Sequence, residues 1–233
     1  MKRSLIALSV AAAVLAPAAE AAPKVYGKLN LSVESFKDSI TPANDTSRVV
    51  SNASRFGVKG EDELTAELSA TYQIEFEVAA DSADNAGTGS KSNFDLTARN
   101  RYVGLKHATY GQVKIGQFDS YLKLAEGEAD LFNDYFGDMK NVVVGQNRLK
   151  NVVAYMSPVV EGFAFNIQHQ TKDAANKDAP AAIGSKGGHS ASLTYTNEDL
   201  GLYAALAADR GIASKGAVFG SEFQRDSERA VVT

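Results

Sequence analysis

The chain has 233 residues, a formal net charge of −4 at pH 7 and no cysteine. The lack of cysteine excludes a disulfide framework, thiol catalysis and thiolate metal sites in this chain. The mildly acidic balance gives no indication of general nucleic-acid binding.

The first predicted element is a secretory signal. The basic pair Lys2 and Arg3 precedes an apolar run over residues 5–16, and residues 19–21 (Ala-Glu-Ala) fit the small-x-small cleavage rule. This run is shorter than the about 20 residues of a spanning helix, which argues against the alternative of an N-terminal membrane anchor. We expect a signal peptide over 1–21 and one domain over 22–233.

The next elements alternate between apolar and polar residues. Residues 25–33 and 55–60 show this period of two, which is typical of a β-strand with one apolar and one wet face. Residues 64–78 alternate without an error over fifteen positions, whereas a usual strand has about five or six. Long alternating strands are what a barrel between lipid and a polar lumen requires. A membrane channel is therefore our leading hypothesis.

The later strands and their connections follow a regular rhythm. Strands are expected over 163–170, 190–196 and 200–208, with weaker candidates where the alternation slips, at 95–107, 112–118, 147–156 and 217–223. Tight turns and long loops then alternate along the chain, as in an up-and-down membrane barrel, and a Greek-key sandwich is not expected to sort its loops this way. The expected short links are 60–63, 107–111, 157–161 and 197–199, and the expected long ones are 37–47, 79–93, 119–146, 171–189 and 209–216.

The long loop over 119–146 differs from the others. It contains a helix-compatible run at 121–126 and an acidic, aromatic cluster at 130–138. Its leucines and aromatic side chains need a surface against which they are buried. The inner wall of a barrel and a contact between barrels both satisfy that need.

Four motifs stand in order between residues 23 and 208. They read Val-Tyr-Gly-Lys-Leu-Asn at 25–30, Ser-Arg-Phe-Gly-Val-Lys-Gly-Glu-Asp at 54–62, Arg-Tyr-Val-Gly-Leu at 101–105, and Asn-Val-Val-Ala-Tyr-Met-Ser-Pro at 151–158 with Gly-Phe at 162–163. Together they resemble the general porins of Gram-negative outer membranes. The resemblance implies an all-β, antiparallel up-and-down transmembrane β-barrel of a trimeric, sixteen-stranded family, with an inward-folded constriction loop.

The resemblance also implies a constriction site. By its position, the loop at 119–146 is the constriction loop, with Asp130 and Asp134 as its acidic groups. The competing interpretation of these two aspartates is capping of the loop backbone or a solvated helix face, and that of the arginines is solvated surface charge. The opposing basic wall would consist of three ladder arginines and three further residues of the same parity: Arg55, Arg99, Arg148, Lys59, Arg101 and Lys150.

The chain departs from the family pattern near its end. It provides about nine or ten strands where the family has sixteen, and residues 225–229 are charged and do not alternate. It lacks a closing strand and a terminal aromatic residue. We therefore expect an incomplete barrel with two unpaired sheet edges.

The sequence favours passive diffusion of ions and small hydrophilic solutes over catalysis. Glu67, Glu75 and Glu77 share one strand face, which indicates wall charge rather than a catalytic carboxylate pair. His107, His169 and His189 show no metal-ligand spacing, and no nucleophile or nucleotide motif occurs. We expect no enzyme activity, cofactor or metal.

The expected location is the bacterial outer membrane. The expected partners are two further copies in a homotrimer, outer-membrane lipid and lipopolysaccharide, and small hydrophilic solutes and ions, with no nucleic acid. Two alternatives remain open: a soluble periplasmic or secreted β-sandwich that binds a ligand, and an outer-membrane barrel lipase. The lipase would need a serine beside His169, the one histidine on a clearly predicted strand.

Overall fold

The computed structural model describes residues 22–36, 46–81, 96–171, 187–215, 222–224 and 226–233, so the predicted signal peptide at 1–21 lies outside it. No helix in these ranges has the length and apolar character needed to cross a membrane. The elements, in chain order, are β1 (Lys24–Lys28), β2 (Leu31–Phe36), β3 (Thr46–Ser51), β4 (Arg55–Thr65), β5 (Leu68–Val78), β6 (Leu96–His107), β7 (Gly111–Asp119), α1 (Tyr121–Leu124), the 3-10 helix η3 (Met139–Asn141), β8 (Arg148–Met156), β9 (Phe163–Gln170), β10 (Gly188–Asn197), β11 (Leu202–Arg210), β12 (Ala213–Lys215), β13 (Glu222–Gln224) and β14 (Ser227–Val232).

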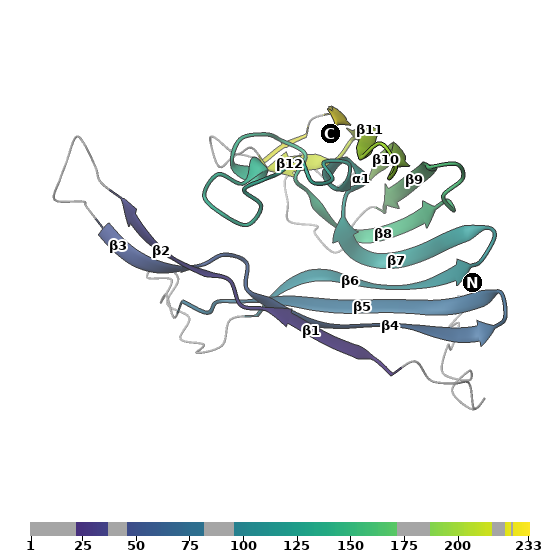
Figure 1. The fold of residues 1–233 in the computed structure, drawn as a ribbon, viewed down its shortest axis with the longest axis horizontal. Coiled ribbons are helices and arrows are strands. Elements are labelled where there is room, and N and C mark those ends of the chain that lie inside the picture. The colour runs from purple at the N-terminus through teal and green to yellow at the C-terminus, as the bar shows by residue number, and fades with distance from the viewer. Residues whose placement is uncertain (1–21, 37–45, 82–95, 172–186, 216–221, 225) are drawn as a thin grey trace, which may run out of the picture.

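Ten strands form one antiparallel sheet, which we call the wall. Their order is β1-β4-β5-β6-β7-β8-β9-β10-β11-β14, so nearly every strand pairs with its neighbour in the chain. Figure 1 shows the wall as a curved surface, with the separate β2–β3 hairpin projecting beyond it. The all-β, up-and-down prediction is confirmed, and β1 and β14 form the two edges of the wall in the described part of the chain.

The two faces of the wall differ in character because side chains alternate along each strand. Where β6 and β7 pair, exposed aliphatic side chains occupy alternate positions at residues 103 and 105 and at residues 113 and 115. The opposite face carries polar side chains. On β5, for example, Gln73 and Glu75 hydrogen-bond to residues of β1 and β6. We call the two faces the outward and the inward face, and this two-sided pattern is what a barrel in lipid requires. The exposed aliphatic residues on β6 and β7 are Leu96, Val103, Leu105, Val113 and Ile115.

The fifteen-residue alternating segment is not one strand. β4 ends at Thr65, residues 66–67 form a tight turn, and β5 begins at Leu68, so the predicted short link at 60–63 is itself part of β4. The prediction was wrong here because a two-residue turn carries the alternation of one strand directly into the next. The strands predicted with slipping alternation at 95–107, 112–118 and 147–156 are confirmed as β6, β7 and β8.

The last strand of the wall is β14, which the sequence analysis missed. It pairs with β11 over six positions, from Asp209 opposite Ser227 to Ala204 opposite Val232. Its charged residues have partners: Glu228 pairs with Arg210, and Arg229 pairs with Glu126. The tenth strand was instead predicted at 217–223, where residues 216–221 lie outside the described ranges.

The loop between β7 and β8 packs part of itself against the inward face. Ser120 begins α1, and its Oγ accepts a hydrogen bond from the N–H of Lys123. Tyr121, Leu122 and Ala125 are each 1% exposed. α1 contacts β9, β10, β11 and β14, so the start of the loop lies against the C-terminal strands of the wall (Figure 1). Of the two surfaces considered for this loop, the inner wall is the one its first residues use.

Candidate constriction site

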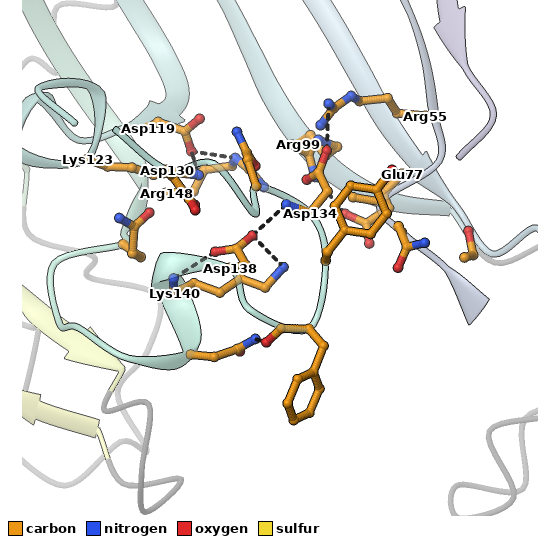
Figure 2. A pocket seen from close by; sticks show the side chains of 18 of the residues that line it. Arg55, Glu77, Arg99, Asp119, Lys123, Asp130, Asp134, Asp138, Lys140 and Arg148 are labelled. Atoms are coloured by element: carbon orange, nitrogen blue, oxygen red, sulfur yellow. Dashed lines mark hydrogen bonds and ion pairs between the residues drawn. The ribbon is translucent and has the colours of Figure 1, made fainter. Parts of the chain in front are cut away.

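A charged hollow of about 730 Å³ lies between the loop after β7, the wall strands β4, β5 and β6, and the β2–β3 hairpin. Figure 2 shows its side chains pointing toward one another from the loop and from the wall. Six basic residues of the described chain line it: Arg48, Arg55, Arg99, Lys123, Lys140 and Arg148. Eight acidic residues line it as well: Glu34, Glu75, Glu77, Asp119, Glu126, Asp130, Asp134 and Asp138.

Asp134 joins the loop to the wall. Its Oδ2 lies 2.9 Å from Nη2 of Arg55, the first residue of β4, and 3.4 Å from Nζ of Lys28, the last residue of β1. The Asp134 side chain is 8% exposed. Asp134 has a φ of +72°, a conformation that aspartate tolerates better than most residues. The loop carboxylate therefore faces the first ladder arginine, as the resemblance implied.

Arg99 pairs with the wall itself. Its Nε lies 2.6 Å from Oε1 of Glu75 and its Nη1 lies 2.7 Å from Oε2 of Glu77, both on the neighbouring strand β5. A β-bulge supports this arrangement, because Arg99 and Asn100 of β6 together oppose the single residue Glu75 of β5. Two carboxylates thus compensate one guanidinium.

Arg148 forms an ion pair with Asp119, the last residue of β7 before the loop. Its Nε lies 3.0 Å from Oδ1 of Asp119 and also donates to Oδ1 of Asn100 at 2.9 Å. Asp119 is 8% exposed and receives a second cation, Lys123, at 3.4 Å. Asn100 completes the network with a 3.2 Å hydrogen bond to the other oxygen of Asp119.

Asp130 and Asp138 act within the loop. The Asp130 carboxylate accepts hydrogen bonds from the N–H groups of Phe132 and Met139, at 3.2 and 3.1 Å. Asp138 accepts from the N–H groups of Asp134 and Lys140, at 2.8 and 2.7 Å. Asp130 lines the hollow, but both described hydrogen-bond partners of its carboxylate are backbone N–H groups of the loop. It therefore caps the loop backbone, which was the competing interpretation of this residue.

The remaining basic residues of the predicted site lie apart from the hollow. Arg101 is in register with Ile74 on the outward face and donates to Oε1 of Gln117 at 2.9 Å. Lys150 is exposed and lines the same shallow outward hollow as Arg101. Lys59 lies on β4 with its Nζ 5.3 Å from the ring of Tyr26, outside the charged hollow.

Two bulges explain why parity misplaced Arg101 and Lys150. Residues 99–100 of β6 oppose one residue of β5, and Lys150 with Asn151 of β8 opposes Gln117 of β7. Each bulge adds one residue to its strand, so positions two apart in sequence no longer share a face. Arg101 and Lys150 therefore do not belong to the group of basic residues that faces the loop.

Sequence reasoning missed several partners of the arginines. Asp119 and Lys28 were not considered for the site, and Glu75 and Glu77 were treated only as wall charge. The signal for the glutamates was available, because they alternate on the polar face of β5. In the described chain, the only nearby partner of Asp119 is Lys123, four positions away, and its partners on the wall, Asn100 and Arg148, are 19 and 29 positions away, so no local signal links it to them.

Comparisons with known proteins identify the family of the chain. A profile of the Gram-negative porin family matches residues 7–231. The chain is 30% identical over 229 residues to the major outer membrane protein P.IB of Neisseria sicca, covering 92% of this chain and 60% of that protein. It is 29% identical over 191 residues to outer membrane protein F of Serratia marcescens, covering 74% and 47%.

Solved structures show the same fold. An anion-selective porin from Comamonas acidovorans gives a TM-score of 0.65 at 19% identity, with 90% of this chain and 62% of that chain covered. The chain spans about 60% of the length of the first relative above. The relatives place it in the bacterial outer membrane. With a porin profile over nearly all of its residues and a porin-like antiparallel wall, the chain belongs to the Gram-negative porin family.

Proposed function

We propose that this protein contributes to a water-filled channel for passive diffusion of ions and small hydrophilic solutes. The observation that carries the proposal is the charged hollow, where a loop carboxylate and three arginines meet between the loop and the inward face of the wall. Charged groups held across a narrow water-filled space sort solutes by size and by field. Arg55, Arg99, Arg148 and Asp134 are the residues of this constriction.

The proposal extends to assembly and export. The exposed aliphatic face of β6 and β7 is suited to contact lipid or another barrel. We infer a homotrimer in outer-membrane lipid and lipopolysaccharide, reached through a signal peptide over 1–21 and a mature domain over 22–233. The channel carries out no covalent chemistry. His169, on which the lipase alternative depended, has His189 as its hydrogen-bond partner rather than a serine.

The roles of the arginines can be tested by ion selectivity. In the double variant Arg99→Ala with Arg148→Ala, Glu75, Glu77 and Asp119 lose their guanidinium partners. The hollow then has two positive charges fewer, so the ion preference of the channel shifts toward cations relative to the wild type. The measurement is the reversal potential in planar lipid bilayers under a KCl gradient.

The control is Arg101→Ala, which removes one arginine charge from the outward face. It leaves the reversal potential at the wild-type value. Heat-modifiable migration on gels confirms that each variant is folded. An unchanged reversal potential in the folded double variant would contradict the assignment of the arginines to the constriction.

A further inference from the structure

Two histidines face each other on neighbouring strands of the wall. His169 on β9 is directly opposite His189 on β10 in the antiparallel register. Their Nδ1 atoms lie 3.4 Å apart, and their ring centroids are 4.6 Å apart. Both side chains are exposed. The two residues are twenty positions apart in sequence, so no metal-ligand spacing revealed the pair.

We propose that His169 and His189 form a binding site for a divalent transition-metal ion of the Zn²⁺ or Cu²⁺ class. A Zn–N bond is about 2.0–2.1 Å long, so two nitrogens 3.4 Å apart subtend an angle of about 110° at the metal. That is close to the tetrahedral angle that Zn²⁺ adopts in proteins. The ion replaces the hydrogen bond between the two Nδ1 atoms: with the proton of each neutral imidazole on Nε2, both Nδ1 lone pairs face the ion.

The surroundings leave room for the other ligands. His169 has the outward parity of Phe163, Phe165 and Ile167, which are exposed apolar residues, and it is the last outward position of β9. It lies about 20 Å along the strand from Phe163, at about 3.3 Å per residue, and the charged residue Arg210, which pairs with the exposed Glu228, lies directly opposite His189 and marks the end of the apolar band there. Water therefore reaches the pair and can complete the coordination of the ion. The protein supplies two nitrogens, and no cluster of three or more ligating residues occurs in the described ranges.

On the described strands on either side of the pair, the charges do not oppose a cation. Arg210 is opposite His189 on β11 and is the nearest basic residue in the register. Its guanidinium pairs with Glu228 and lies 3.9 Å from Asp226, so two carboxylates compensate it. The other strand neighbour, opposite His169 on β8, is the uncharged Val153.

The third histidine provides a matched control. The Nδ1 of His107 already accepts a hydrogen bond from the N–H of Thr109 at 3.1 Å. Its Nε2 lies 3.5 Å from Oε2 of Glu67, and its ring packs on Tyr110. Like His169, His107 lies near the end of a strand. Its partners in the described residues are Thr109, Glu67 and Tyr110, and none of them is a histidine.

The test is a titration of the folded protein, prepared without a histidine tag and in detergent, with Zn²⁺ and with Cu²⁺. We expect saturable binding of one ion per chain in the wild type and in His107→Asn, with Cu²⁺ bound more tightly than Zn²⁺. We expect His169→Asn and His189→Asn to lose it, and Mg²⁺ not to compete. Wild-type affinity in either variant would overturn the proposal.

A spectroscopic measurement on the wild type avoids any dependence on the folding of variants. Electron paramagnetic resonance of the Cu²⁺-loaded protein is expected to show hyperfine coupling to two imidazole nitrogens. Coupling to one nitrogen or to none would overturn the site, even if some copper binds elsewhere. Neither measurement involves ion flow, so the outcome is independent of the proposed channel function.

Discussion

The two parts of the constriction loop are held in place in different ways. The root, residues 120–127 with 144–147, buries Tyr121, Leu122 and Ala125, and the last two pack on β11 and β14. The N–H of Leu122 donates to Oγ of Ser190, and Nδ2 of Asn147 donates to Asp209. The tip, residues 130–140, exposes Leu131 by 86% and contacts the wall through ion pairs of Asp134.

This difference shows which forces position a constriction. Apolar burial at the root is insensitive to salt, whereas partly exposed ion pairs at the tip are screened by it. Removal of a root side chain should therefore affect the stability of the whole protein. Changes at the tip should affect the position of the loop and leave global stability nearly unchanged.

The largest effect is expected at the root. Leu122→Ala removes a side chain that is 1% exposed and should lower the free energy of unfolding by about 2–5 kcal/mol through lost burial and a cavity. Leu131→Ala at the tip is the matched control and should change it by no more than about 0.5 kcal/mol. Urea unfolding in lipid vesicles measures both, and equal losses would contradict the distinction between root and tip.

The next effect concerns Arg229, which ties both ends of the root to β14. Its guanidinium donates to the carbonyls of Leu122 and Val144, each at 3.2 Å, and pairs with Glu126 at 3.1 Å. Arg229→Met leaves the nearly buried Glu126 without its cation and should cost about 3 kcal/mol in the same unfolding assay.

Adding Glu126→Gln to Arg229→Met separates charge burial from loss of packing. The double variant no longer has an unpaired carboxylate, so it should recover part of the stability that the single variant loses. If the double variant is less stable than the single one, Glu126 is not what makes the loss of Arg229 costly.

A smaller effect is expected for the ion pairs of the tip. Asp134→Asn weakens the contacts with Arg55 and Lys28, whose side chains are partly exposed, and should cost about 1 kcal/mol or less. A spin label at position 131 should become more mobile in this variant. In about 1 M salt the wild type should approach the variant, because the screening length falls to about 3 Å. Salt-independent mobility in the wild type would show that ion pairs do not hold the tip.

The smallest effect is the pH response of the tip. Burial alone would raise the pKa of Asp138, but hydrogen bonds from the N–H groups of Lys140 and Asp134 outweigh it and hold the pKa below 3.8. The stability from this group is fully present above pH 3.8 and is lost as pH falls through the lower folded value. The label at position 131 should gain mobility in that acidic range, and Asp138→Asn should remove this step from the titration.

Much of the wall could be predicted from the sequence because alternation is a local property. It identified β9, β10 and β11, and with slipping parity β6, β7 and β8. It failed at the turn of residues 66–67, where alternation continues through the hairpin, and at β14, whose charged residues find partners far away in the chain.

The site was predictable only where a motif carried it. The resemblance led us to expect Asp134 on the loop and Arg55, Arg99 and Arg148 on the facing wall, but it did not predict which of these arginines Asp134 contacts. The outward position of Arg101 and the pairing of Arg148 with Asp119 depend on bulges and long-range register. No local pattern of residues reveals the position of a bulge or the register between distant strands.

The most direct test of the account is a scan of spin labels along β5, one position at a time, with the protein in lipid vesicles. Labels at the outward positions Ile74 and Phe76 should be accessible to oxygen dissolved in lipid, and those at Gln73 and Glu75 to a water-soluble reagent. We predict that the two accessibilities alternate with a period of two from Leu68 to Val78. Uniform access of the water-soluble reagent at every position would contradict a wall between lipid and a water-filled lumen.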